Sequence, residues 1–250
     1  MRELVEQLAK GQRLDTKSLS ALLKQCTLDD SLLQFLRDYA VRTARQQFGL
    51  GIYIRGLIEL SSYCRNDCLY CGLRRSNRSA ERYRLTADEV LECCREGYKL
   101  GFRTFVMQGG GDGTHSDAWL EELICRIRSL YPDVAITLSL GERSEESYRR
   151  LKRAGANRYL LRHEAADEEL YASLHPDSRG IKHRLSCIEA LQRAEYQVGM
   201  GMMIGVKGQT IDHIAEDLLL VKKYDCQMVG IGPFLPHRAT PLGEEPAGAL

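Results

Sequence analysis

Along the chain, hydrophobic and polar residues alternate between two patterns after residue 49. Short apolar runs typical of buried strands lie at 52–60, 103–107, 134–138, 157–161, 197–203 and 227–232. Between these runs, apolar residues recur at helical spacing over longer segments. A strand followed by a helix, repeated along the chain, predicts parallel strands joined by right-handed crossovers. The pattern predicts an α/β fold of the TIM-barrel type with about six parallel strands.

Helix-start signals support this prediction and outline the organisation of the chain. Thr86-Ala87-Asp88-Glu89 is a capping box, in which a hydroxyl and a carboxylate each accept from a backbone N–H group. Further helices are expected to start near Ser116, Ser144, Ile181 and Thr210. Since leucines at helical spacing fill the first 48 residues, we expect an N-terminal helical region (1–48), a β/α barrel core (49–236) and a loose C-terminal tail (237–250).

Composition narrows the functional classes that such a fold can serve. Of the 250 residues 44% are hydrophobic, enough for a sizeable core, and the formal net charge is only +1. This near-neutral charge gives no support for a nucleic-acid partner. The chain also lacks the run of about 18 apolar residues that a bilayer span requires. We therefore expect a cytoplasmic protein that binds neither nucleic acid nor a membrane.

Three of the nine cysteines are clustered directly after the first apolar run. The stretch SSYCRNDCLYCG places Cys64, Cys68 and Cys71 at Cys-x3-Cys-x2-Cys spacing, where the active-site groups of a β/α barrel collect. An odd number of cysteines with three clustered favours a reducing compartment and a metal site over a disulfide framework. The other six are scattered through periodic segments and are expected to be small buried hydrophobes.

Three thiolates leave two kinds of metal site open. A structural zinc site takes four protein ligands, usually as two paired knuckles, and His115 could fold back as the fourth. The triplet spacing, however, resembles no common zinc knuckle pair. An iron–sulfur cluster normally takes four cysteines, so three would leave one iron open to a non-protein ligand.

The segment CRNDCLYC resembles the Cys-x3-Cys-x-aromatic-Cys signature of the radical S-adenosylmethionine (SAM) superfamily. The resemblance implies that Cys64, Cys68 and Cys71 hold a 4Fe–4S cluster, that SAM binds its fourth iron, and that Tyr70 lies near the adenine. It also implies reductive cleavage of SAM to methionine and a 5′-deoxyadenosyl radical within a complete or partial β/α barrel. An electron donor such as ferredoxin or flavodoxin is the implied partner.

Longer stretches narrow the resemblance. YIRGLIELSSYCRNDCLYCGLRRSN, RYLLRHE, MIGVKGQT and MVGIGPFLPH are similar to the HydE type of FeFe-hydrogenase maturase, over nearly all of the chain. This implies a small sulfur-containing or iron-bound substrate and other hydrogenase maturases as partners. Methylornithine synthase and biotin synthase share the fold and the cysteine motif, so an enzyme of that kind is the alternative. A non-catalytic iron–sulfur scaffold or electron carrier is the alternative of a different class.

The resemblance also implies roles for single residues. Glu164 matches a carboxylate that contacts SAM, and Arg184 matches an arginine near the SAM carboxylate. An arginine fork suits a carboxylate, and an acidic group suits the ammonium or ribose hydroxyls of the same ligand. Ile204 falls in a segment that packs near adenine, and Ser139 matches a position that lines the substrate cavity.

The sequence departs from the HydE-type pattern at three places. In the loop QGGGDG, Gly109 and Gly110 are expected near the methionine part of SAM, but Gly111 stands where a glutamate is usual and Asp112 is the nearest substitute. Lys207 replaces a proline in GVKGQT, which favours a looser loop. Only six strands are predicted where such proteins have eight, so the open edge of the last strand favours self-association.

Overall fold

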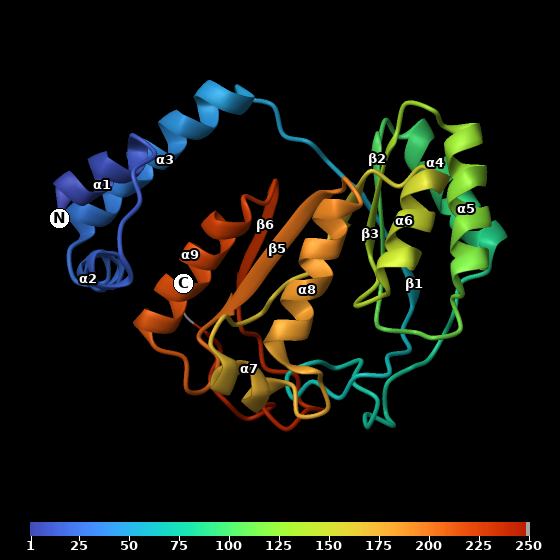
Figure 1. The fold of residues 1–250 in the computed structure, drawn as a ribbon. Helices are drawn as coiled ribbons and strands as arrows, with labels where there is room; N and C mark the ends of the chain where they lie inside the picture. Colours follow the sequence, from blue (N-terminus) through green and yellow to red (C-terminus); the bar gives the residue numbers. More distant parts are fainter. Residues whose placement is uncertain (249–250) are drawn as a thin grey trace.

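A computed structural model describes residues 1–248, so the last two residues of the expected tail lie outside the described part. Within it, six strands form one sheet in the order β1-β2-β3-β4-β5-β6, and all neighbouring pairs are parallel (Figure 1). The strands are β1 (Gly56–Ser61), β2 (Thr104–Gly109), β3 (Ala135–Ser139), β4 (Arg158–Leu160), β5 (Gln197–Ile204) and β6 (Met228–Pro233). The predicted α/β class and the parallel strands are confirmed.

Nine helices lie among residues 1–248: α1 (Arg2–Ala9), α2 (Thr16–Cys26), α3 (Asp30–Phe48), α4 (Ala87–Lys99), α5 (Asp117–Leu130), α6 (Glu145–Ala154), α7 (Glu168–Leu174), α8 (Gly180–Arg193) and α9 (Ile211–Tyr224). The predicted capping box of α4 is present, and Ser116, Ser144 and Thr210 cap α5, α6 and α9. The short helix α7 was not predicted. No helix in the described part is long and apolar enough to cross a membrane.

The main core lies between the outer face of the sheet and the helices that cover it. Alternate strand residues such as Leu60, Phe105 and Ile136 are buried there, as the pleat of a strand requires. The predicted first strand was too long at its start, because β1 begins at Gly56. Ile52 is 90% exposed, since residues 52–55 have no neighbouring strand to pair with.

The N-terminal helices form a separate layer beside α9. Val5, Leu22 and Leu32 pack in one buried cluster with Ala215 of α9. An extended segment then leads from α3 to β1 (Figure 1). This layer therefore rests on the side of the sheet close to α9 and leaves the carboxyl ends of the strands free to carry a site.

Residues 237–248 were expected to form a loose tail, and this expectation is wrong for the described part of the tail. The amide of Leu242 donates to the carbonyl of Leu69 at 3.3 Å, and that of Gly248 donates to Phe234 at 2.8 Å. Glu245 also pairs with Lys207 at 2.7 Å, so the predicted loose loop at Lys207 has a partner. The tail is thereby tied to the cysteine-bearing loop.

Candidate functional site

The clustered cysteines lie on the connection that follows β1, at the carboxyl end of the sheet. Residues 62–77, here called the cysteine loop, contain Cys64, Cys68 and Cys71, and all three are partly buried. The guanidinium of Arg82 donates to backbone carbonyls along this loop, including those of Leu73 at 3.0 Å and Arg74 at 2.8 Å. Nothing in the sequence indicated this role of Arg82, since its bonds go to main-chain atoms.

A second contact fixes the middle of the cysteine loop. Asp67 accepts from Nε of Arg74 at 2.7 Å and from the hydroxyl of Ser76 at 2.6 Å. The Arg74 hydrogen bond, followed by that of Ser76, holds the pKa of Asp67 well below its usual value. The loop is therefore shaped by its own side chains before anything binds to it.

The three thiols share one electrostatic environment. Burial, followed by the neighbouring thiols of Cys71 and Cys64, raises the pKa of Cys68 to about 12. The nearby Arg184 opposes this shift. Burial also raises the pKa of Cys71, and Cys64 adds to that shift. The net effect favours the neutral thiols of Cys68 and Cys71, so a thiolate-binding metal centre would have to displace protons from both.

The glycine-rich loop after β2 lies directly against Cys64. A methyl group at Gly110 would lie 2.6 Å from the Cβ of Cys64 and 2.6 Å from the carbonyl oxygen of Tyr63. The amide of Gly111 donates to Sγ of Cys64 at 3.3 Å. Gly109 ends β2 and pairs with Ser61 of β1. Gly109 and Gly110 therefore lie beside the cysteine loop, and their predicted place near the methionine part of SAM stays a prediction.

Asp112 is engaged by protein groups. Its carboxylate accepts from Nε of Arg84 at 2.7 Å and from the hydroxyl of Ser61 at 2.6 Å. Burial disfavours the charged form, but the hydrogen bonds from Arg84 and Ser61 outweigh it and hold the pKa of Asp112 well below its usual value. This arrangement argues against the predicted contact of Asp112 with SAM.

A different carboxylate, that of Glu142, comes from the connection after β3, which passes close to Gly111. Glu142 follows Gly141, and a Cβ at Gly141 would be 3.7 Å from the Cα of Gly111. Oε1 of Glu142 pairs with Nε of Arg184 at 3.1 Å. Sequence reasoning missed Glu142 because it comes from the connection after β3, while the absent glutamate was sought after β2.

Arg184 lies on α8 with only 12% of its side chain exposed. Its Nε also donates to the hydroxyl of Tyr171 at 3.3 Å. Burial alone would lower the pKa of Arg184, but the facing Tyr171 and Glu142 raise it above its usual value. The guanidinium is thus a fixed cation close to Cys68, and its predicted contact with the SAM carboxylate stays a prediction.

Glu164 follows β4 in a strained conformation. Its φ is +68°, in the left-handed region that residues with a Cβ rarely adopt. Burial raises the pKa of its carboxyl group. Among residues 1–248, Oε2 of Glu164 is buried without a hydrogen-bond partner, and Nη2 of Arg162 is 3.4 Å away. A buried, unsatisfied carboxylate oxygen is costly and points to a ligand that would satisfy it.

Tyr70 is held by a buried histidine. Its hydroxyl lies 2.9 Å from Nε2 of His175, and Nδ1 of His175 lies 2.9 Å from the carbonyl oxygen of Tyr171. A carbonyl can only accept, so Nδ1 carries the proton and the Tyr70 hydroxyl donates to Nε2. Burial lowers the pKa of His175 to about 4, which keeps this arrangement neutral. The ring of Tyr70 is therefore fixed at the cysteine loop.

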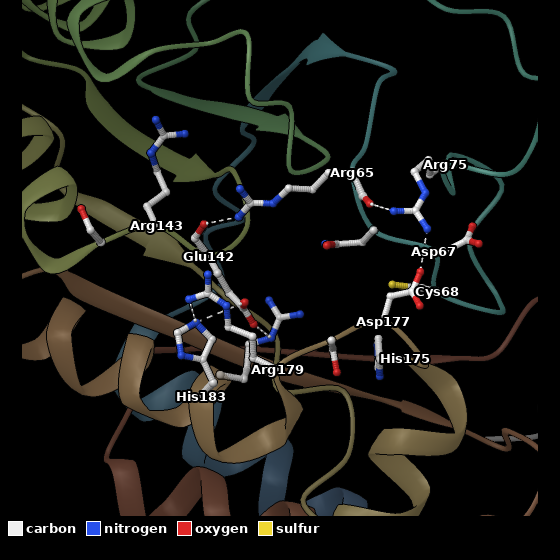
Figure 2. A pocket seen from close by; sticks show the side chains of 14 residues that line it. Arg65, Asp67, Cys68, Arg75, Glu142, Arg143, His175, Asp177, Arg179 and His183 are labelled. Carbon is white, nitrogen blue, oxygen red and sulfur yellow. Dashed lines mark hydrogen bonds and ion pairs between the residues drawn. The ribbon is translucent and has the colours of Figure 1, made fainter.

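A cavity of about 590 Å³ opens beside Cys68. Its lining includes Arg65, Arg75, Arg143, Arg179 and Arg184, with Asp67, Glu142 and Asp177 as the acidic groups. In Figure 2 the side chain of Arg65 reaches from the cysteine loop to the backbone carbonyl of Glu142, and Arg75 reaches Asp177. The cavity joins Cys68 and Arg184 in one cationic space.

Ser139 and Ile204, two further predicted site residues, lie at strand ends outside this lining. Ser139 ends β3 and pairs in register with Gln108. Ile204 ends β5, and its carbonyl accepts from Phe234 at 2.8 Å. Tyr70 and Glu164 are likewise absent from the cavity lining. The structure therefore brings Cys68 and Arg184 together in one cavity and leaves the roles of Ser139 and Ile204 as predictions.

Known proteins resemble this chain in both sequence and fold. The family model described as the Radical SAM superfamily matches residues 58–221. The [FeFe] hydrogenase maturase subunit HydE of Thermotoga maritima is 45% identical over 204 residues, which are 82% of this chain and 58% of that protein. A biotin synthase of Magnetococcus marinus is 28% identical over 245 residues, which are 96% of this chain and 74% of that protein. The crystal structure of methylornithine synthase (PylB) matches with a TM-score of 0.87 at 26% identity, covering 96% of this chain and 70% of that one.

The chain belongs to the radical SAM superfamily. Enzymes of this family bind a 4Fe–4S cluster and SAM, so the predicted family and cofactors are confirmed. The chain spans 58% of the length of its HydE relative.

The three thiols of the cysteine loop can be compared with the ligands that a 4Fe–4S cluster requires. Among residues 1–248, no three Cys, His, Asp or Glu side chains have the spacing of ligands around a single metal ion. Thiolates that each bind a different iron of a cluster lie farther apart than ligands of one ion. Three thiols on one braced loop, with a backbone N–H directed at Cys64 Sγ and a fixed cation near Cys68, fit such a group.

Proposed function

We propose that this chain carries the SAM-cleaving site of a HydE-type radical SAM maturase. The observation that carries the proposal is the buried carboxylate oxygen Oε2 of Glu164, which has an ion-pair contact with Arg162 at 3.4 Å but no hydrogen bond, at the same end of the sheet as the cysteine loop. A buried acceptor without a hydrogen bond, close enough to Cys71 to raise the pKa of its thiol, is expected where a polar ligand and a metal cluster bind together.

In this proposal Cys64, Cys68 and Cys71 hold the 4Fe–4S cluster as thiolates. When bound, the cluster supplies the electron that cleaves SAM to methionine and a 5′-deoxyadenosyl radical. Gly110 lets the loop after β2 approach Cys64, and the amide of Gly111 donates to its sulfur. Such hydrogen bonds help to set the potential of a cluster.

SAM is bound by groups from the carboxyl ends of β1 to β5 and from α8. Arg184 pairs with its carboxylate, and Glu164 accepts from its ribose hydroxyls or ammonium group. Glu142 takes the place of the glutamate that Gly111 lacks, because Glu142 and Gly111 line one cavity and the Glu142 carboxylate pairs with Arg184. Tyr70 and Ile204 pack near the adenine. Gly109 and Gly110 lie near the methionine part of the ligand.

The substrate is proposed to be a small sulfur-containing or iron-bound molecule, and the product serves assembly of the FeFe-hydrogenase active site. The 45% identity to HydE supports this choice. The alternative is a methylornithine-synthase or biotin-synthase type of reaction, which the TM-score of 0.87 to PylB favours. Ser139, at the end of β3, is proposed to line the substrate cavity. Other hydrogenase maturases are the proposed partners.

An acidic electron donor such as ferredoxin or flavodoxin is proposed to dock where the cationic cavity reaches the surface. The mouth beside Cys68 carries Arg65, Arg75 and Arg179. Of these, Arg75 is 59% exposed. Opposite charges steer association, so raising the salt concentration should slow reduction by the protein donor and leave reduction by dithionite unchanged.

The SAM contacts are tested with Glu164→Ala and Arg184→Ala. Loss of a charged hydrogen-bond partner costs about 1.5 to 3 kcal/mol, so each variant should bind SAM roughly ten- to hundredfold more weakly. Iron content after anaerobic reconstitution should stay close to that of the wild type, because neither residue is a cluster ligand. Unchanged SAM affinity in both variants would show that these roles are wrong.

A further inference from the structure

A second acidic group lies buried behind Glu164 and has no role in the proposed site. Asp217 is on α9, and both it and its partner His163 are 0% exposed. Burying a carboxylate is costly unless hydrogen bonds replace its water. A fully buried carboxyl group in the middle of a helix that packs on a sheet therefore calls for a specific explanation.

The contacts of Asp217 converge on one of its two oxygens. Oδ1 accepts from the backbone amide of Ala166 at 2.6 Å and lies 3.1 Å from Nε2 of His163. Within residues 1–248, Oδ2 of Asp217 and Nδ1 of His163 have no partner. With an ionised Asp217, Nε2 of His163 carries the proton of the shared hydrogen bond.

The two partners of Asp217 stand on either side of Glu164 in the chain. His163 precedes it and Ala166 follows it by two residues, and the intervening turn places Glu164 at φ +68°. The amide of Glu164 donates to the carbonyl of Gly201 in β5 at 2.9 Å. The turn is thus held by α9 on one side and by β5 on the other, as a strained conformation requires if it is to persist.

We propose that Asp217 is a positioning residue, which holds the strained turn 163–166 so that the Glu164 carboxylate faces the SAM site. This inference rests on the proposed function. Asp217 itself does not touch the ligand. It acts by fixing the chain before and after Glu164, and its effect on SAM must therefore pass entirely through Glu164.

A purely structural role for Asp217 makes a different prediction. If Asp217 only anchored α9 to the sheet, its loss would lower stability and would weaken SAM binding equally whether or not Glu164 is present. Residues that act through one another give non-additive effects in a double-mutant cycle. Because both contacts of Asp217 use Oδ1, asparagine can keep them, so Asp217→Asn should preserve positioning without the charge.

The experiment measures SAM affinity by equilibrium dialysis on the anaerobically cluster-loaded full chain. Asp217→Ala should bind SAM about tenfold more weakly with unchanged iron content, and Asp217→Asn should stay within about twofold of the wild type. Asp217→Ala added to Glu164→Ala should cause no further loss. The matched control is Tyr224→Phe on the same helix, which removes the hydrogen bond to Glu189 and should lower the melting temperature while leaving SAM affinity unchanged.

If Asp217→Ala does not fold, His163→Ala replaces it in the same cycle, with an expected weakening of about threefold. Wild-type affinity in Asp217→Ala, or a further loss when Asp217→Ala is added to Glu164→Ala, would overturn the positioning role and leave the proposed SAM contact of Glu164 standing. Wild-type affinity in Glu164→Ala would overturn both.

Discussion

Replacing Gly110 with alanine tests how the glycine-rich loop supports the cysteine loop. The added Cβ would lie 2.6 Å from the Cβ of Cys64, 2.6 Å from the carbonyl oxygen of Tyr63 and 2.9 Å from Sγ of Cys64. Carbon atoms in contact are about 3.5 to 4.0 Å apart. Rotation of the Cys64 side chain relieves only the sulfur contact, because the other two atoms move only with the backbone.

The backbone at Cys64 must therefore move by roughly 1 Å, and overpacking of this kind costs about 1 to 3 kcal/mol. The shift also disturbs the hydrogen bond from Gly111 to the Cys64 sulfur, which is 3.3 Å long. We expect Gly110→Ala to retain less than about half of the wild-type iron after anaerobic reconstitution, since one of three thiolates is displaced.

The assay is iron analysis together with electron paramagnetic resonance of the reduced protein. Gly113→Ala is the matched control in the same loop, because nothing lies within 4 Å of a Cβ at that position. Gly111→Ala is an intermediate case, since its nearest atom is Nε of the flexible Arg65, at 3.3 Å. Equal iron content in Gly110→Ala and Gly113→Ala would refute the proposed support of Cys64 by the glycine loop.

Two further predictions concern the buried His175 and the outer edges of the sheet. Burial lowers the pKa of His175 from 6.5 to about 4, so the unfolded chain binds a proton in this window that the folded chain excludes. The free energy of unfolding should therefore fall by roughly 3 kcal/mol as the pH drops from about 6.5 to 4. Urea unfolding of the metal-free chain measures this fall, and His175→Gln should remove it. The same pH dependence of stability in the wild type and in His175→Gln would contradict the prediction. Within residues 1–248, the outer edge of β6 pairs with no strand, and that of β1 is bridged only at its end, where Ser61 meets Arg84; Leu57 (57%) and Val229 (47%) are exposed on these two strands. The chain should therefore elute as dimers or larger species in size-exclusion chromatography with light scattering, and a version extended by two β/α units from a relative should not. A stable monomer of the 250-residue chain would contradict this prediction.

The sequence predicted those features that depend on neighbouring residues. The capping box at Thr86 and the cysteine triplet are local patterns, and both were found where they were expected. The prediction for Asp112 does not fit its observed contacts, because Arg84 approaches it from a distant part of the chain. Arg82 and Asp217 were missed, since their partners are backbone groups and a buried histidine that no spacing rule connects to them.

Glu142 is another residue that the sequence alone could not connect to the site. The glycine at position 111 in place of a glutamate was visible in the sequence, but the carboxylate that we propose as its replacement comes from the connection after β3. Parallel strands bring their carboxyl ends together, so a group lost after β2 can be supplied after β3. The sequence alone gives no register between these two connections, and the structure was needed to connect them.

The most direct test of the central claim is anaerobic reconstitution of the chain with iron and sulfide, followed by reduction and addition of SAM. The account predicts about four irons per chain, an electron paramagnetic resonance signal that changes when SAM binds, and formation of 5′-deoxyadenosine. Alanine at Cys64, Cys68 or Cys71 should abolish all three. One tightly held zinc per chain without any response to SAM would contradict the cluster. A full complement of iron without 5′-deoxyadenosine would instead identify a non-catalytic scaffold or electron carrier.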